Sequence, residues 1–187
     1  KFYEPAQELN LPFFFHNSGA PLNADAILDY TQPYLLDEIA REFPALKIII
    51  ANMGLPFIEQ TLSMVAKHDN VYTDLTIKPK NIWQTYNTVV AAHEYGVMDK
   101  LLFGSGFPSA HAGQCIETLL GFNMLLADTN LPVVPRGSIR NVIERNTLEL
   151  LGIDNESPQP QEEKKKKPKK RKKAGTTREK GNSNNND

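Results

Sequence analysis

The sequence predicts an α/β fold built from four parallel strand–helix units. Apolar runs too short to be helices alternate along the chain with segments in which apolar residues recur at helical spacing. Three of these short runs end in loops that contain Gly or Pro, which commonly mark the ends of elements. Strands that alternate with helices form parallel βαβ units and not hairpins. We therefore expect a parallel sheet with helices packed against it.

The expected strands are short and apolar. They are residues 11–16, 47–52, 70–76 and 100–105. The second contains Ile48, Ile49 and Ile50, and β-branched side chains pack well on a pleated surface. In the third, Tyr72 shares a face with Asp74 because successive side chains of a strand point to opposite sides.

The expected helices each carry an apolar stripe. They are residues 35–43, 57–67, 83–95, 114–127 and 137–151. In the second of them, Ile58, Leu62 and Val65 fall on one side of the helix. The last one ends at Gly152, a residue type that commonly follows a helix.

The composition is that of a globular chain. It has 187 residues, 40% of them apolar, and no apolar run near the roughly 20 residues of a membrane-spanning helix. The one cysteine, Cys115, indicates a reducing compartment, a cytoplasmic location and a buried, inert thiol. The chain begins at Lys1, so a targeting segment further upstream is left open.

The charge divides the chain into two parts near Ile153. Residues 154–187 hold eleven Lys or Arg and six Asp or Glu, whereas residues 1–153 hold ten basic and sixteen acidic groups. The second part has almost no apolar residues, so burial cannot offset the entropy of ordering it. We expect a domain over residues 1–153 and a disordered, Lys-rich tail over residues 154–187.

Four strand–helix units make half of a (β/α)8 TIM barrel, which typically needs about 250 residues. Four parallel strands cannot close a cylinder, so both outer strands would expose unpaired edges. We expect the missing amino-terminal half of the barrel upstream of Lys1, and self-association of the chain when it is made alone. An open doubly wound sheet is the alternative, but no Gly-rich phosphate loop follows any expected strand.

Two loop sequences resemble those of a known family. Residues 51–57, Ala-Asn-Met-Gly-Leu-Pro-Phe, resemble the Ala-His-x-Gly-x-Pro segment of the amidohydrolase-related metal-dependent hydrolases, also called amidohydrolase 2. Residues 100–108 are similar to the Leu-Phe-Gly-Ser-Asp-Tyr/Phe-Pro signature of that family. Residues 43–49, 70–74 and 145–152 agree with it as well. The resemblance implies the carboxyl-terminal half of the barrel, strands five to eight. This half would carry those ligands of a divalent metal site that come later in the sequence, with zinc as the expected metal.

The resemblance also implies which positions form the site. His16 falls at the position of the strand-five histidine, Asn52 at that of the strand-six histidine, and Gly106 at that of the strand-eight aspartate. A catalytic zinc usually has three ligands from His, Cys, Asp and Glu, whereas Asn is a weak ligand and Gly has no side chain. The family's aspartate is also the general base for the metal-bound water, so Gly106 removes both roles. We therefore expect His16 as the retained ligand and an impaired site.

Two more residues are weaker candidates for this site. Asp74 faces the barrel interior in this prediction and is a substitute carboxylate, or else a buried, hydrogen-bonded acid or a turn residue. His111 follows Gly106 and is a candidate for the substrate pocket, or else an exposed loop histidine.

The parental chemistry implied by the resemblance is attack of a metal-activated water on a C–N or C–O bond of a small-molecule substrate, or a related decarboxylation. The alternative is a catalytically silent binding or assembly domain. The basic tail would then make weak, nonspecific contacts with anions, including nucleic acid, or serve only as a solvated segment.

Overall fold

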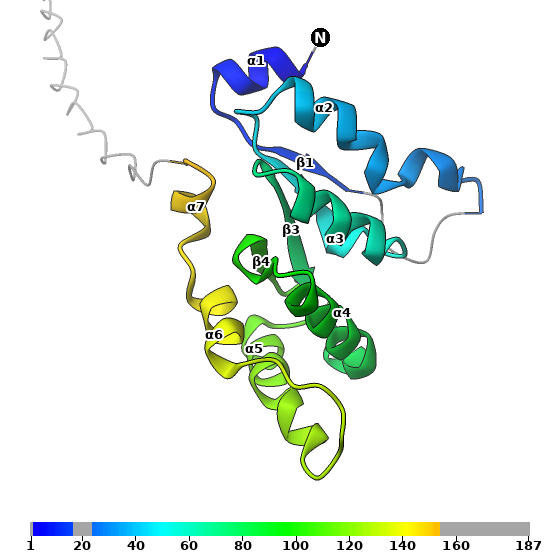
Figure 1. Cartoon of the computed structure of the whole chain (residues 1–187), viewed down its shortest axis with the longest axis vertical. Helices are drawn as coiled ribbons and strands as arrows, with labels where there is room; N and C mark the ends of the chain where they lie inside the picture. Colours follow the sequence, from blue (N-terminus) through cyan, green and yellow to red (C-terminus); the bar gives the residue numbers. More distant parts are fainter. Residues whose placement is uncertain (1, 17–23, 154–187) are drawn as a thin grey trace, which may run out of the picture. The chain divides into compact units, whose positions relative to one another are not determined.

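The computed structural model describes residues 2–16 and 24–153 and has one four-stranded parallel sheet (Figure 1). The strands are β1 (Phe13–Phe15), β2 (Ile48–Ile50), β3 (Val71–Thr76) and β4 (Leu101–Gly104), hydrogen-bonded in chain order. Each pair is parallel, with Phe14 opposite Ile49 and Ile49 opposite Tyr72. The α/β fold with four parallel strands is therefore confirmed. The predicted Lys-rich tail lies outside the described residues.

Seven α-helices and six short 3₁₀-helices accompany the strands in the described part of the chain. The α-helices are α1 (Tyr3–Glu8), α2 (Asp37–Glu42), α3 (Ile58–Lys67), α4 (Ile82–Glu94), α5 (Ala112–Gly121), α6 (Arg136–Glu144) and α7 (Thr147–Leu150). The 3₁₀-helices are η1 (Leu28–Thr31), η2 (Pro33–Leu36), η3 (Ala51–Gly54), η4 (Pro79–Asn81), η5 (Met98–Lys100) and η6 (Phe122–Leu126). Within these ranges no helix has the length and apolar character needed to cross a membrane.

Three helix predictions need correction. The predicted helix 137–151 is broken into α6 and α7, because Arg145 is extended and Asn146 caps α7 by accepting a hydrogen bond from the backbone N–H of Glu149. The guanidinium of Arg145 donates to the backbone oxygens of Leu101 and Met98, which holds the break in place. The predicted helix 114–127 tightens into η6 after Gly121. The predicted helix 35–43 begins as η2, and α1 and η1 were not predicted.

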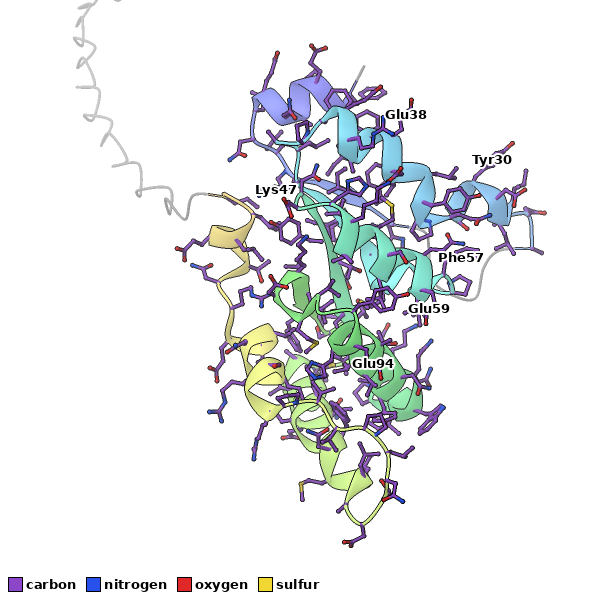
Figure 2. The ribbon with its side chains drawn as sticks, viewed as in Figure 1. Tyr30, Glu38, Lys47, Phe57, Glu59 and Glu94 are labelled. Atoms are coloured by element: carbon purple, nitrogen blue, oxygen red, sulfur yellow. The ribbon has the colours of Figure 1, made fainter. Side chains whose placement is uncertain are left out.

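The larger hydrophobic core lies between the sheet and its helices. Alternation along the strands sends Ile48, Ile50, Val71, Leu75 and Leu101 to this side, where all are at most 3% exposed. Figure 1 shows α2, α3 and α4 side by side over this face. Their outer surfaces are charged, and Figure 2 labels Glu38, Glu59 and Glu94 there. This is the helix-covered outer face expected of a βα barrel.

A smaller cluster lies on the opposite, inner face of the sheet. It consists of Ile49, Tyr72 and Leu102 from the three strands β2, β3 and β4, together with Leu151, which directly follows α7. The side chain of Asn10, before β1, donates to the backbone oxygen of Gly152 at 2.8 Å and fixes the end of this segment. The chain after α6 therefore returns to the inner face and covers part of it.

Candidate functional site

The site begins with a contact between the ends of two neighbouring strands. His16 directly follows β1, and Asn52 lies in η3, which directly follows β2. The Nδ2 atom of Asn52 is 3.3 Å from the Nε2 atom of His16. The two side chains are thus within hydrogen-bonding distance, and the direction of the bond depends on the tautomer of His16. The structure thus brings together two of the positions that the sequence assigned to a metal.

The backbone after β2 turns in an uncommon way that aims the Asn52 side chain. Asn52 and Met53 have φ values of 52° and 55°, and Gly54 has 62°, so three successive residues are left-handed. Asn adopts this conformation more readily than most residues, whereas Met does not. Strained backbone of this kind persists only where the surrounding structure holds it.

Asp74 holds the start of this turn. The backbone N–H of Asn52 donates to Asp74 Oδ2 at 2.9 Å, and the hydroxyl of Thr76 donates to Asp74 Oδ1. A Cβ atom at Gly104 on the adjacent strand would lie 3.3 Å from both Asp74 Oδ1 and Thr76 Oγ1, so glycine gives this pair room. A continuous chain of hydrogen bonds therefore runs from β3 through Asn52 to His16.

Gly106 adjoins this chain without adding a functional group. Its φ is +62°, and a Cβ atom there would lie 2.9 Å from Thr76 Cγ2. His111 is exposed at the start of α5, and its ring centroid is 6.1 Å from that of Phe107. The structure therefore places His16, Asn52 and Asp74 together and Gly106 beside Thr76, while His111 belongs to a separate ring pair.

A hollow of 460 Å³ extends from these residues over the inner face of the sheet. The hollow is lined by polar side chains from three strand ends and by apolar side chains of the sheet. The lining residues are Phe14, His16, Ile49, Ala51, Asn52, Asp74, Thr76, Leu102, Phe103, Gly104, Thr147 and Leu151. Strand alternation in the sequence could identify most of this set. It could not identify Thr147 and Leu151, because the return of the chain after α6 is a tertiary feature.

His68 and Cys115 lie in structural surroundings away from this site. His68 Nε2 is 2.6 Å from Asp37 Oδ1, on the helix side of the sheet. Cys115 is fully buried, and this burial raises the pKa of its thiol. A raised pKa disfavours the reactive thiolate, in keeping with an inert cysteine.

The residues present do not fit a zinc centre. Within residues 2–16 and 24–153, no three His, Cys, Asp or Glu side chains lie close enough together to hold a metal ion. The cluster offers one imidazole, one carboxylate that accepts two hydrogen bonds, and one neutral amide. Zinc sites in proteins are typically built from three or four His, Cys or carboxylate ligands.

The model of the amidohydrolase family Amidohydro_2 matches residues 1–152. This chain belongs to the amidohydrolase family. The resemblance found in the sequence is thereby confirmed. Members of this family are generally metal-dependent, which makes the poor fit of this cluster to zinc the main chemical question. No curated protein matches the chain.

The solved structures that match are TIM-barrel proteins. One is an uncharacterized TIM-barrel protein from Bordetella bronchiseptica, with 19% identity and a TM-score of 0.54 over 81% of this chain and 49% of that one. Another is a probable 2-pyrone-4,6-dicarboxylic acid hydrolase from Acinetobacter baumannii with citric acid bound, with 17% identity and a TM-score of 0.55 over 81% of this chain and 56% of that one. The amidohydrolase chain thus spans about half the length of these barrels. At such identities the likeness shows the fold alone.

Proposed function

We propose that this chain is half of an amidohydrolase-type barrel that binds a small molecule at the carboxyl ends of its strands. We further propose that positions 16, 52 and 106 no longer hold a metal that activates water. The functional half-site is then a metal-free binding surface, which needs four further strands to close around its ligand. This corresponds to the silent binding domain that the sequence offered as an alternative.

The contact between Asn52 and His16 is the observation that carries this proposal. An imidazole binds a metal through a ring-nitrogen lone pair, and here the side-chain amide of Asn52 lies 3.3 Å from Nε2 of His16. A cation at this atom would have to displace the amide of Asn52. The amide thus links the ends of β1 and β2 in the place where a shared metal ion would link two histidines.

The surroundings of Gly106 and Asp74 support the same interpretation. Gly106 supplies neither a ligand nor a general base, the two roles that the resemblance gives to an aspartate there. Asp74 accepts hydrogen bonds on both carboxylate oxygens, from the backbone of Asn52 and from Thr76. Asp74 therefore acts in this proposal as a residue that positions the Asn52 turn and not as a substitute ligand.

The second candidate function is metal-dependent hydrolysis of a C–N or C–O bond, or a related decarboxylation, by a site completed elsewhere in the barrel. Membership in a generally metal-dependent family is the observation in its favour. The name of the Acinetobacter structure, a probable hydrolase, points in the same direction. This candidate predicts that the protein binds zinc without any change to its sequence.

Zinc content separates the two functions. We compare the unmodified protein with the triple variant Asn52→His, Thr76→Ser and Gly106→Asp, by mass spectrometry of metals after dialysis. Histidine tolerates the left-handed conformation of Asn52 better than most residues. Thr76→Ser removes the methyl group that lies 2.9 Å from a Cβ at position 106 and keeps the hydroxyl. The exposed substitution Asn87→His is the matched control, because it adds a histidine outside the site.

We expect the unmodified protein and the Asn87→His control to contain far less than one zinc per chain, and the triple variant to gain zinc. Adding His16→Ala to the triple variant should abolish the gain. Close to one zinc per chain in the unmodified protein, with zinc-dependent hydrolysis of p-nitrophenyl acetate, would reject the proposal in favour of the enzyme. Equal zinc in all variants would show that positions 52 and 106 do not decide metal binding.

A further inference from the structure

The hollow over the inner face of the sheet has an apolar floor with small residues beside it. Phe14, Ile49 and Leu102, one from each of three strands, line this floor. The ring of Phe14 is 54% exposed, so it is accessible to a ligand. Ala51 and Gly104 follow two residues after Ile49 and Leu102, and their small size keeps the space open. The hollow can therefore receive the apolar body of a small molecule.

Asp74 gives this hollow a negative charge that the other lining residues do not offset. Among the residues that line the hollow, Asp74 is the only Asp or Glu, and none is Lys or Arg. The groups that donate hydrogen bonds to its carboxylate, the backbone N–H of Asn52 and the hydroxyl of Thr76, are neutral. Asp74 forms no ion pair with any other residue that the structure describes. The two hydrogen bonds thus satisfy the carboxylate oxygens and leave the charge in place.

This charge distinguishes between anionic and neutral ligand groups. An anion that leaves water for the hollow loses hydration free energy, and no lysine or arginine of the lining compensates for it. It would also be repelled by the carboxylate of Asp74, more strongly than in bulk water because the dielectric constant is lower here. A neutral amide or hydroxyl avoids both costs. It can also exchange hydrogen bonds with the side chains of His16 and Asn52 in the same lining.

We propose that the part of the ligand lying against this half of the barrel is uncharged and largely apolar, with an amide or hydroxyl group, and that Asp74 excludes carboxylates from it. Asp74 then determines specificity in addition to holding the Asn52 turn. The inference rests on the proposed function, because a bound metal ion would reverse the charge of the site and attract anions. It concerns only the ligand group at this face of the sheet.

Benzamide and benzoate are matched probes for this inference, because they share a phenyl ring and differ in charge. Ligand-observed NMR titrations of the protein at its natural length, after dialysis against EDTA, give both dissociation constants. The titrations are run at pH 8, where imidazoles are mostly uncharged. We expect benzamide to bind about tenfold more tightly than benzoate. Phe14→Ala should weaken the binding of benzamide, because it removes part of the apolar floor.

Two substitutions of the lining test the role of charge. Asp74→Asn should bring the affinity for benzoate close to that for benzamide, because it removes the charge and keeps an oxygen for the backbone N–H of Asn52. Asp128→Asn is the matched control, since Asp128 is exposed outside the lining and Asn tolerates its left-handed backbone. If Asp74→Asn does not fold, Thr147→Lys decides the question. This added cation should strengthen the binding of benzoate, whereas the neutral substitution Thr147→Gln should not.

Three results would overturn the inference. Benzoate that binds as tightly as benzamide after EDTA treatment, with a ratio that neither Asp74→Asn nor Thr147→Lys changes, would refute it and leave the proposed function standing. Binding of benzoate that EDTA treatment abolishes would reveal a bound metal ion, and the proposed function would fail together with the inference. Absence of binding of both probes at millimolar concentration would show that the hollow does not hold an apolar ring.

Discussion

The residues Asn52, Met53 and Gly54 share a left-handed backbone, and each tolerates it for a different reason. Asn52 gains hydrogen bonds to His16 and Asp74 through its side chain and its backbone. Met53 is 2% exposed, and burial in the core offsets the strain of its backbone. Gly54 has no steric penalty, and it is also the only residue type that fits there. A Cβ atom at this position would lie 1.8 Å from Thr61 Oγ1 and 2.9 Å from Pro33 Cγ.

Gly54→Ala should therefore be more destabilising than an alanine at another left-handed glycine. Gly96 is the matched control, because its φ is +70° and a Cβ atom there would meet nothing within 4 Å. We expect Gly54→Ala to lower the free energy of unfolding by about 1–3 kcal/mol more than Gly96→Ala, through overpacking against Thr61 and Pro33. Urea unfolding followed by circular dichroism measures both. Equal decreases would show that Thr61 and Pro33 move aside at little cost.

At the scale of elements, the segment formed by α7 and Leu151 acts as a cover for the inner face. Leu151 is 5% exposed and packs with Ile49, Tyr72 and Leu102, one residue from each of three strands. Leu148 lies within α7 but is 41% exposed. The two leucines therefore separate the effect of packing from the effect of shortening a side chain.

Leu151→Ala should lower the free energy of unfolding by about 2–4 kcal/mol, because it removes buried methyl groups and leaves a cavity. Leu148→Ala should cost well under about 1 kcal/mol. The midpoints of urea unfolding give the comparison. A decrease in stability at Leu151 no larger than at Leu148 would mean that the segment after α6 detaches in solution.

A polar contact joins α2 to the end of α3. Asp37 Oδ1 lies 2.6 Å from His68 Nε2, and Lys67 Nζ pairs with the same oxygen at 2.5 Å. The hydrogen bond from Lys67, and next the one from His68, lower the pKa of Asp37 below its ordinary value. Because the pKa of Asp37 is lower in the folded state, its ionised carboxylate stabilises the fold at pH values above its unfolded pKa of about 3.9. This stabilisation is lost as the pH falls through the pKa of the folded state.

Asp37→Asn should accordingly reduce stability at neutral pH and leave it unchanged at the acid end of the range. The difference between the two proteins should shrink as the pH falls below about 4. Thermal melts from pH 7 to the acid limit of folding measure this difference, with Asp69→Asn as an exposed control. A difference that persists at the lowest pH would assign the effect to packing and not to the charge of Asp37.

At the scale of the whole molecule, the sequence separates its charges: residues 1–153 are net acidic and residues 154–187 are net basic. Residues 154–187 hold eleven of the 21 basic groups, and most of these lie in residues 164–173. A dense run of Lys and Arg binds duplex DNA by releasing counterions, with an affinity that falls steeply as salt rises. The acidic remainder of the chain has no such attraction.

Replacing Lys164, Lys165, Lys166 and Lys167 by Gln should weaken binding to duplex DNA and flatten its salt dependence. The slope of log K against log salt should become shallower by about 0.9 for each phosphate that the variant no longer neutralises. Fluorescence anisotropy with a labelled duplex at several salt concentrations measures the slope. Lys80→Gln, an exposed lysine in η4, is the control. No binding by the unmodified chain at low salt would leave the tail as a solvated charged segment.

The alternating pattern of the sequence located the four strands to within two residues at each end, because burial on both faces of a parallel sheet requires short apolar runs. It also placed Asp74 and Thr76 on a common face, since side chains alternate along any strand. The glycines and prolines of the loops identified the family through residues 51–57 and 100–108. These features depend on neighbours in the sequence.

The tertiary structure decided the features that depend on distant neighbours. The left-handed turn at Asn52 exists because Asp74, Thr61 and Pro33 surround it, and no local pattern encodes that environment. The break at Arg145 follows from its hydrogen bonds to η5 and β4. The position of the Asn52 amide at His16 joins residues 36 apart in the chain. Sequence thus determined which strands form and to which family they belong, whereas packing determined what the ends of those strands do.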